Sequence, residues 1–119
     1  MMDLGVGKMA KLKIPKKLEE TLTQIRDRVR ELKQNYGSLS RWGRPYIFNV
    51  KEFAVIWYLN KKMDIGLNEI AKFIYVDKSS LYKIIRRFEN EGTVSIYDKN
   101  ENMVKTITVT PQELENIVN

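Results

Sequence analysis

Residues 67–92, LNEIAKFIYVDKSSLYKIIRRFENEG, carry the clearest structural pattern in this chain. Its apolar residues predict a short helix over about 67–74, a tight turn, and a longer helix over about 78–90. Asp77 is placed to cap the second helix and Gly92 to end it, because these residue types are favoured at those positions. The segment therefore predicts two helices packed across a tight turn.

The longer helix has two chemically different faces. One face carries an apolar stripe at the i, i+3, i+4, i+7 spacing of a buried surface. At about 100° per residue, the opposite face and its flanks carry small polar residues first and cations one and two turns later. The stripe consists of Leu81, Ile84, Ile85 and Phe88. The polar face and its flanks consist of Ser79, Ser80, Tyr82, Lys83, Arg86, Arg87 and Asn90.

The shorter helix completes a recognisable pattern. Ile70, Ala71 and Ile74 line one side of it, and the small Ala71 side chain lets the second helix cross closely. Together with the apolar positions, this small residue makes the segment resemble the helix-turn-helix of DNA-binding regulators. Tyr75 departs from the family, which usually has glycine there. Because a positive φ is costly for a bulky residue, we expect a wider turn.

The flanking segments extend this resemblance. Upstream, Asn49 and Glu52 form a capping-box pattern that opens a helix over 50–62. Its middle, 53–59, is apolar on nearly every side and must be covered on two faces. Downstream, residues 94–97 and 103–109 predict a β-hairpin around the polar DKNEN loop, and TPQE at 110–113 begins a last helix.

The order helix, helix, reading helix, hairpin, helix resembles the winged helix-turn-helix family over residues 49–119. It predicts a mainly α fold with a small β-hairpin (α+β), preceded by an added N-terminal helix. The resemblance implies sequence-specific binding to double-stranded DNA as a transcriptional regulator, with the helix from Lys78 in the major groove. Its DNA-binding residues on this helix would be Lys78, Ser79, Ser80, Tyr82, Lys83, Arg86 and Arg87. Of these, Ser79, Ser80, Tyr82, Lys83 and Arg86 would read base edges.

The resemblance further assigns the 98–103 hairpin as the wing. Its tip would contact phosphate or the minor groove, although a hairpin that only covers the core fits the sequence equally well. The predicted wing residues are Lys99, Asn100, Asn102 and Lys105.

Charge agrees with a polyanionic partner. The net charge is +6, and residues 78–88 contribute +4 with no acid, whereas residues 89–119 sum to −4. Residues 1–14 are expected to form a flexible basic arm. In the connector 38–48, Trp42, Tyr46 and Phe48 are expected to anchor the chain to the core. Arg41 and Arg44 are candidates for DNA-backbone contacts there.

The helix expected over 15–37 carries an apolar seam at the 3.5-residue period. The seam could dock on the second face of the apolar 53–59 helix, or pair with its twin in a homodimer. We favour the dimer, because two reading helices on a palindrome gain affinity and specificity together. The proposed dimerisation residues are Leu18, Leu22, Ile25, Val29, Leu32 and Tyr36.

Composition excludes several classes of function. The chain has no cysteine and no histidine, so thiolate metal sites and a Ser-His-Asp triad are impossible. We expect neither an enzyme nor a cofactor or small-molecule ligand. The sequence contains no apolar run of about 18 residues, so it predicts no membrane span. The expected location is the cytoplasm, on the nucleoid. The alternatives are a winged-helix protein–protein adaptor and a plasmid- or virus-type replication or partition factor.

Overall fold

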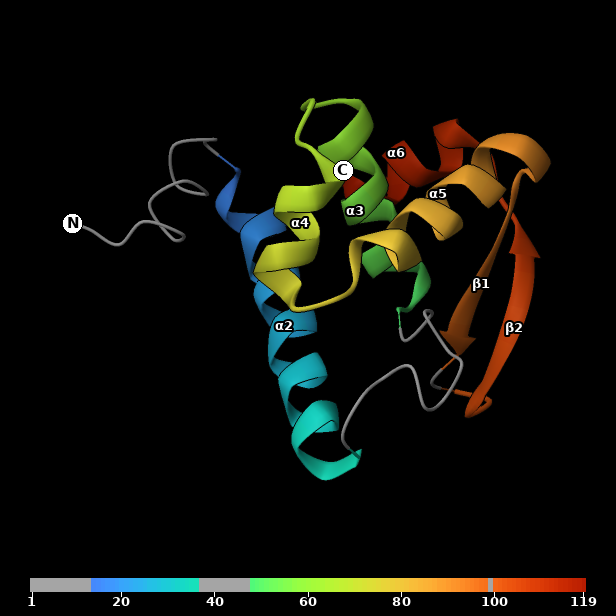
Figure 1. Cartoon of the computed structure of the whole chain (residues 1–119). Helices are drawn as coiled ribbons and strands as arrows, with labels where there is room; N and C mark the ends of the chain where they lie inside the picture. Colours follow the sequence, from blue (N-terminus) through green and yellow to red (C-terminus); the bar gives the residue numbers. More distant parts are fainter. Residues whose placement is uncertain (1–13, 37–47, 99) are drawn as a thin grey trace.

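The computed structural model describes residues 14–36, 48–98 and 100–119. Within these ranges the fold is mainly helical with one antiparallel hairpin, as the sequence predicts (Figure 1). The predicted element boundaries differ from the observed ones by two residues at most. The elements are α2 (Lys16–Tyr36), α3 (Val50–Lys61), α4 (Leu67–Ile74), α5 (Lys78–Glu91), β1 (Thr93–Asp98), β2 (Met103–Thr108) and α6 (Pro111–Val118).

Helix α3 lies at the centre of the molecule. It packs against α2 and α6 and also contacts β1 (Figure 1). From α5, the ring of Phe88 meets Phe53 and Trp57 edge to face, at centroid distances of 5.6 and 6.4 Å. Nearly every residue from Phe53 to Leu59 is buried, which confirms that this apolar helix is covered on more than one face.

The start of α3 carries the predicted capping box. The Asn49 side chain accepts a hydrogen bond from the Glu52 amide at 2.8 Å, and Glu52 Oε1 accepts one from the Asn49 amide at 3.0 Å. These two bonds satisfy backbone donors that no helical carbonyl reaches. The capping box predicted from the sequence is therefore confirmed.

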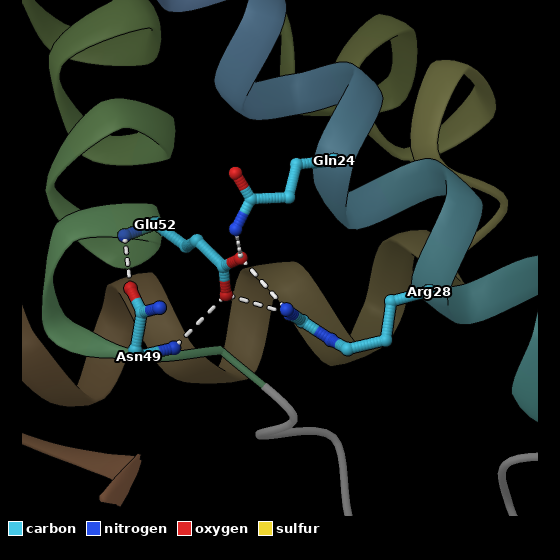
Figure 2. Close-up of polar contacts among 4 residues, drawn as sticks. All are labelled: Gln24, Arg28, Asn49 and Glu52. Atoms are coloured by element: carbon cyan, nitrogen blue, oxygen red, sulfur yellow. Dashed lines mark hydrogen bonds and ion pairs between the residues drawn. The ribbon is translucent and has the colours of Figure 1, made fainter. Parts of the chain in front are cut away.

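Glu52 has a second role that the sequence did not reveal. Its side chain is only 1% exposed. Both of its carboxylate oxygens accept hydrogen bonds from the Arg28 guanidinium of α2, at 2.6 and 2.8 Å (Figure 2). Gln24, also on α2, donates to Glu52 Oε2 at 3.4 Å. A buried carboxylate is tolerated only when it is paired and hydrogen-bonded. This bidentate pair therefore fastens α2 to the first turn of α3.

The apolar seam of α2 is part of the protomer's own core. It faces α3 and α4, and four of its members are at most 5% exposed. Those four are Leu18, Leu22, Ile25 and Val29. Leu32 is half-buried, and the Tyr36 side chain lies outside the described residues. The prediction of a dimer seam was wrong for these four residues, because side chains already covered within one protomer offer no apolar surface to another.

The turn between α4 and α5 is tight. Tyr75 adopts the left-handed conformation, with φ 61° and ψ 33°. The amides of Tyr75 and Val76 both donate hydrogen bonds to the Ala71 carbonyl, which ends α4 in a tight C-terminal turn. The wider turn expected from the tyrosine was wrong. The strain at Tyr75 is offset by contacts from α2, where Arg30 lies over the Tyr75 ring at 5.5 Å.

The Tyr75→Gly variant is expected to have a higher free energy of unfolding than the Tyr75→Ala variant, by about 1 kcal/mol. The reason is that alanine has a Cβ atom, which makes a positive φ sterically unfavourable, whereas glycine has none. Both Tyr75→Gly and Tyr75→Ala remove the ring, so their difference isolates the backbone. Urea denaturation of the two variants measures it. An alanine variant as stable as the glycine variant would show that residue 75 does not hold the left-handed conformation.

The hairpin follows α5 directly. Gly92 ends the helix at φ 73°, as predicted, and its amide bonds to the Phe88 carbonyl at 2.8 Å. The strand register runs from Thr93 opposite Thr108 to Asp98 opposite Met103. Val94 and Ile96 point into the core. The hairpin thus packs beside the C-terminal end of α5, with its tip projecting away from α6 (Figure 1).

Candidate nucleic-acid interface

Helix α5 is held by its apolar stripe. The four predicted stripe residues are all buried, and they pack toward α4, α3 and β1. This confirms the inward face of the helix. Because an α-helix turns about 100° per residue, a buried stripe of this width forces the opposite residues toward solvent.

Most of the predicted reading residues are exposed. Ser80 is the exception, because it is half-buried on the flank of the stripe. Tyr82 is 45% exposed, a large fraction for an aromatic ring. The exposed members of the predicted set are Lys78, Ser79, Tyr82, Lys83, Arg86 and Arg87, and Asn90 is exposed beyond them.

Lys83 and Arg86 are the centre of this exposed face. Neither side chain forms an ion pair with a carboxylate in residues 14–36, 48–98 or 100–119. A cation without an internal counter-charge keeps its full attraction for an external anion. The face therefore presents two accessible positive charges, one and two turns after the start of the helix.

Two other residues of the set have partners. Arg87 donates to the Ser95 hydroxyl at 3.0 Å and lies 3.6 Å from Glu91, which partly neutralises it. The Ser79 hydroxyl donates to the Asp77 carboxylate. Asp77 is the N-cap residue, as predicted, but its side chain makes no capping bond to the helix backbone. Arg87 and Ser79 are therefore less available to an external partner than Lys83 and Arg86.

The hairpin tip offers little positive charge among its described residues. Lys105 lies 3.2 Å from both Asp98 and Glu101. The Asn102 side chain accepts a hydrogen bond from the Tyr97 hydroxyl. Asn100 is exposed, and Lys99 lies outside the described residues. Lys105 is therefore less available to a phosphate than the sequence suggests, because two carboxylates of its own hairpin lie close to it.

The same contacts shift two pKa values in the hairpin. The hydrogen bond from Lys105 holds the pKa of Asp98 below its usual value, with backbone bonds from Glu101 and Asn100 acting in the same direction. The hydrogen bonds to Asp98 and Glu101 raise the pKa of Lys105. Both shifts favour the charged forms, so the pair stays ionised through the neutral range.

Part of the predicted interface lies outside the described residues. Arg41 and Arg44 of the connector lie outside the described residues, as do Trp42 and Tyr46. The basic arm lies there too, except for Ile14. Phe48 is described and is fully buried, as expected for an anchor.

Sequence reasoning missed a basic stripe on α2. Arg26 lies over the Phe73 ring at 5.2 Å, Arg30 lies over the Tyr75 ring, and Lys33 Nζ donates to the Tyr75 carbonyl at 2.6 Å. These three cations are spaced by four and three residues, immediately beside the apolar seam. The spacing of these cations can be seen in the sequence. That they face α4 depends on how the apolar seam of α2 packs against the core.

In the described part of the chain, no three or more acidic side chains cluster in a way that suits a metal ion. None of the helices described is long and apolar enough to cross a membrane.

Comparison with protein-family models, with curated proteins and with solved structures gave no significant match to this chain.

Proposed function

We propose that this protein is a non-enzymatic, sequence-specific binder of double-stranded DNA with a winged helix-turn-helix fold, acting as a transcriptional regulator. In this proposal α4 and α5 are the helix-turn-helix, α5 is the reading helix, and the β1–β2 hairpin is the wing. The order of the elements and the left-handed turn residue between α4 and α5 support it.

One observation carries the proposal: α5 buries its apolar stripe and turns Lys83 and Arg86 to solvent without a carboxylate partner among the described residues. On a surface helix, acids at i±3 or i±4 would stabilise such cations, and α5 has none at i±4 from either residue. An α-helix fits the major groove of B-DNA, which is about 12 Å wide, and lysine and arginine there bond to O6 and N7 of guanine.

The other residues have supporting roles in this scheme. Small side chains such as Ser79 at the start of α5 allow the helix to approach the base edges closely. Lys78 and Arg87, on the flanks, contact phosphates and so orient the helix on the duplex. Tyr82 contacts the groove wall through its exposed ring. The hairpin contributes little charge, because Lys105 is neutralised within it.

The first test is the salt dependence of binding. If each protomer neutralises roughly three or four phosphates, the logarithm of the affinity should fall with the logarithm of salt at a slope of about −3 per protomer. Fluorescence anisotropy of a labelled random duplex measures this slope. A duplex that two protomers occupy would show a slope near −6.

A parent protein that does not bind duplex DNA even at low salt would contradict the proposal, and so would an affinity that does not change with salt. Selection from a random duplex library should then enrich one preferred sequence, because base-edge contacts discriminate by roughly 1–3 kcal/mol each. A library that stays unenriched would contradict sequence-specific reading.

A further inference from the structure

An open cleft lies between the C-terminal half of α2, the helix α4 and the start of α5. Its volume is about 940 Å³. The residues that matter for its chemistry are Arg30, Lys33, Lys72, Tyr75, Asp77 and Lys78. It therefore joins the added N-terminal helix to the first turn of the proposed reading helix.

The cleft is strongly cationic. Four of its lining side chains are positive and one is negative, which leaves a net charge of +3. None of the four cations forms an ion pair with a carboxylate in the described ranges. The one acid, Asp77, already accepts a hydrogen bond from the Ser79 hydroxyl. Unneutralised cations gathered from three helices suit a polyanion better than a neutral ligand.

Two of these cations come from α2 and are held in place. Lys33 Nζ donates to the Tyr75 carbonyl, and Arg30 lies over the Tyr75 ring with Nη2 3.4 Å from its hydroxyl. Neither contact cancels the positive charge. The buried seam of α2 and the Arg28–Glu52 pair fix the helix against the core, so Arg30 and Lys33 are presented at a constant position.

The position of the cleft matches one part of a DNA duplex. A helix in the major groove has a sugar–phosphate strand along each side of the groove. Lys78, at the start of α5, is one of the residues that line the cleft, so a strand beside the N-terminal end of α5 would pass this surface. Its open form suits a continuous strand.

We infer that this cleft holds a sugar–phosphate strand of the duplex bound by α5, and that Arg30 and Lys33 of α2 contact its phosphates. The inference rests on the proposed function and extends it. It makes the added helix part of the DNA-binding surface, and it gives that helix a task other than dimerisation.

The test compares two double variants of the full chain. Arg30→Gln with Lys33→Gln removes two charges at the cleft. Lys16→Gln with Lys17→Gln removes two exposed charges from the other end of the same helix. At 1.5 Å per residue the two sites lie roughly 20–25 Å apart along α2. Urea denaturation of each variant establishes that it folds, and anisotropy with labelled duplex follows binding across salt concentrations.

The cleft variant should lower the magnitude of the salt slope by about 2, because each lost phosphate contact removes roughly one unit. Its affinity should fall by the same factor on every duplex sequence, since phosphates carry no sequence information. The control variant should keep the parent's slope. Equal slopes for both variants, in a parent that does bind duplex, would overturn this inference and leave the proposed function standing.

A second arm uses inorganic tripolyphosphate as the probe, in calorimetry without DNA. The inference would be wrong if the parent bound tripolyphosphate tightly, the cleft variant did not bind it, and the cleft variant kept the parent's salt slope on DNA. The cleft would then be a site for a small anion. A parent that bound no duplex at all would remove the proposed function and this inference together.

Discussion

Replacing Glu52 with alanine is expected to lower the free energy of unfolding by roughly 2–4 kcal/mol. The variant loses the reciprocal cap at Asn49 and withdraws the carboxylate from Arg28. Removing one partner of a fully buried ion pair costs about 3–5 kcal/mol, and the cost is smaller here because the Arg28 side chain is 32% exposed. Urea denaturation followed by far-ultraviolet circular dichroism measures the loss.

Helix α6 supplies the matched control. Glu113 occupies the same position in a second capping box, with Thr110 as the N-cap, but it is exposed and has no ion pair among the described residues. Glu113→Ala should therefore cost no more than about 1 kcal/mol, the usual effect of losing such a cap. Equal losses in the two variants would show that the Arg28 pair adds nothing to the cap.

A third variant separates charge from shape. Glu52→Gln keeps an oxygen for the Asn49 amide but offers the Arg28 guanidinium a neutral partner. Its stability should lie between those of the parent and Glu52→Ala, because the cap survives and the charge-assisted bonds do not. A glutamine variant as unstable as the alanine variant would assign the whole effect to the ion pair, and one as stable as the parent would assign it to the cap.

The second large effect is expected on DNA binding. Replacing Arg86 with alanine should cost roughly 1–3 kcal/mol on the preferred duplex and relax base preference at one position. Adding Lys83→Ala should weaken binding further and bring the preferred duplex close to the affinity of random DNA. Anisotropy with the selected duplex and a scrambled duplex measures both affinities.

Lys62→Ala is the control for the single Arg86→Ala variant. It likewise removes one positive charge, from the C-terminal end of α3, where Lys62 lies 4.0 Å from Glu115 of α6. The side chains of Lys62, Lys83 and Arg86 are all exposed. The free energy of unfolding of each variant should therefore lie within about 0.5 kcal/mol of the parent's. If Lys83→Ala with Arg86→Ala bound both duplexes as the parent does, α5 would not be the reading helix.

Local features of this fold could be predicted from residue patterns. The two capping boxes, the terminating Gly92 and the apolar stripe of α5 all depend on neighbours within about one or two turns. The same is true of the hairpin, which residues 94–97 and 103–109 predicted, and in the structure Val94 and Ile96 are buried. The proposed reading face followed because the side opposite a buried stripe must face solvent.

Three features depended on contacts that the residue patterns do not specify. Tyr75 keeps a positive φ because it ends α4 and because Arg30 of α2 lies over its ring. These contacts outweigh the usual preference of a bulky residue against positive φ. The neutralisation of Lys105 follows from the hairpin register, which brings Asp98 and Glu101 within 3.2 Å. The burial of Glu52 required Arg28 to arrive from a separate helix.

Residue patterns alone predict which faces of the helices are apolar, where most helices begin and end, and which cations lie opposite the α5 stripe, because these depend on short-range periodicity and capping. What covers each apolar face depends on how the helices pack against one another. The seam of α2 has the same pattern whether it meets a twin or its own core, since hydrophobic burial is not directional. Packing against α3 and α4 made that choice, and with it placed Arg30 and Lys33 beside the start of α5.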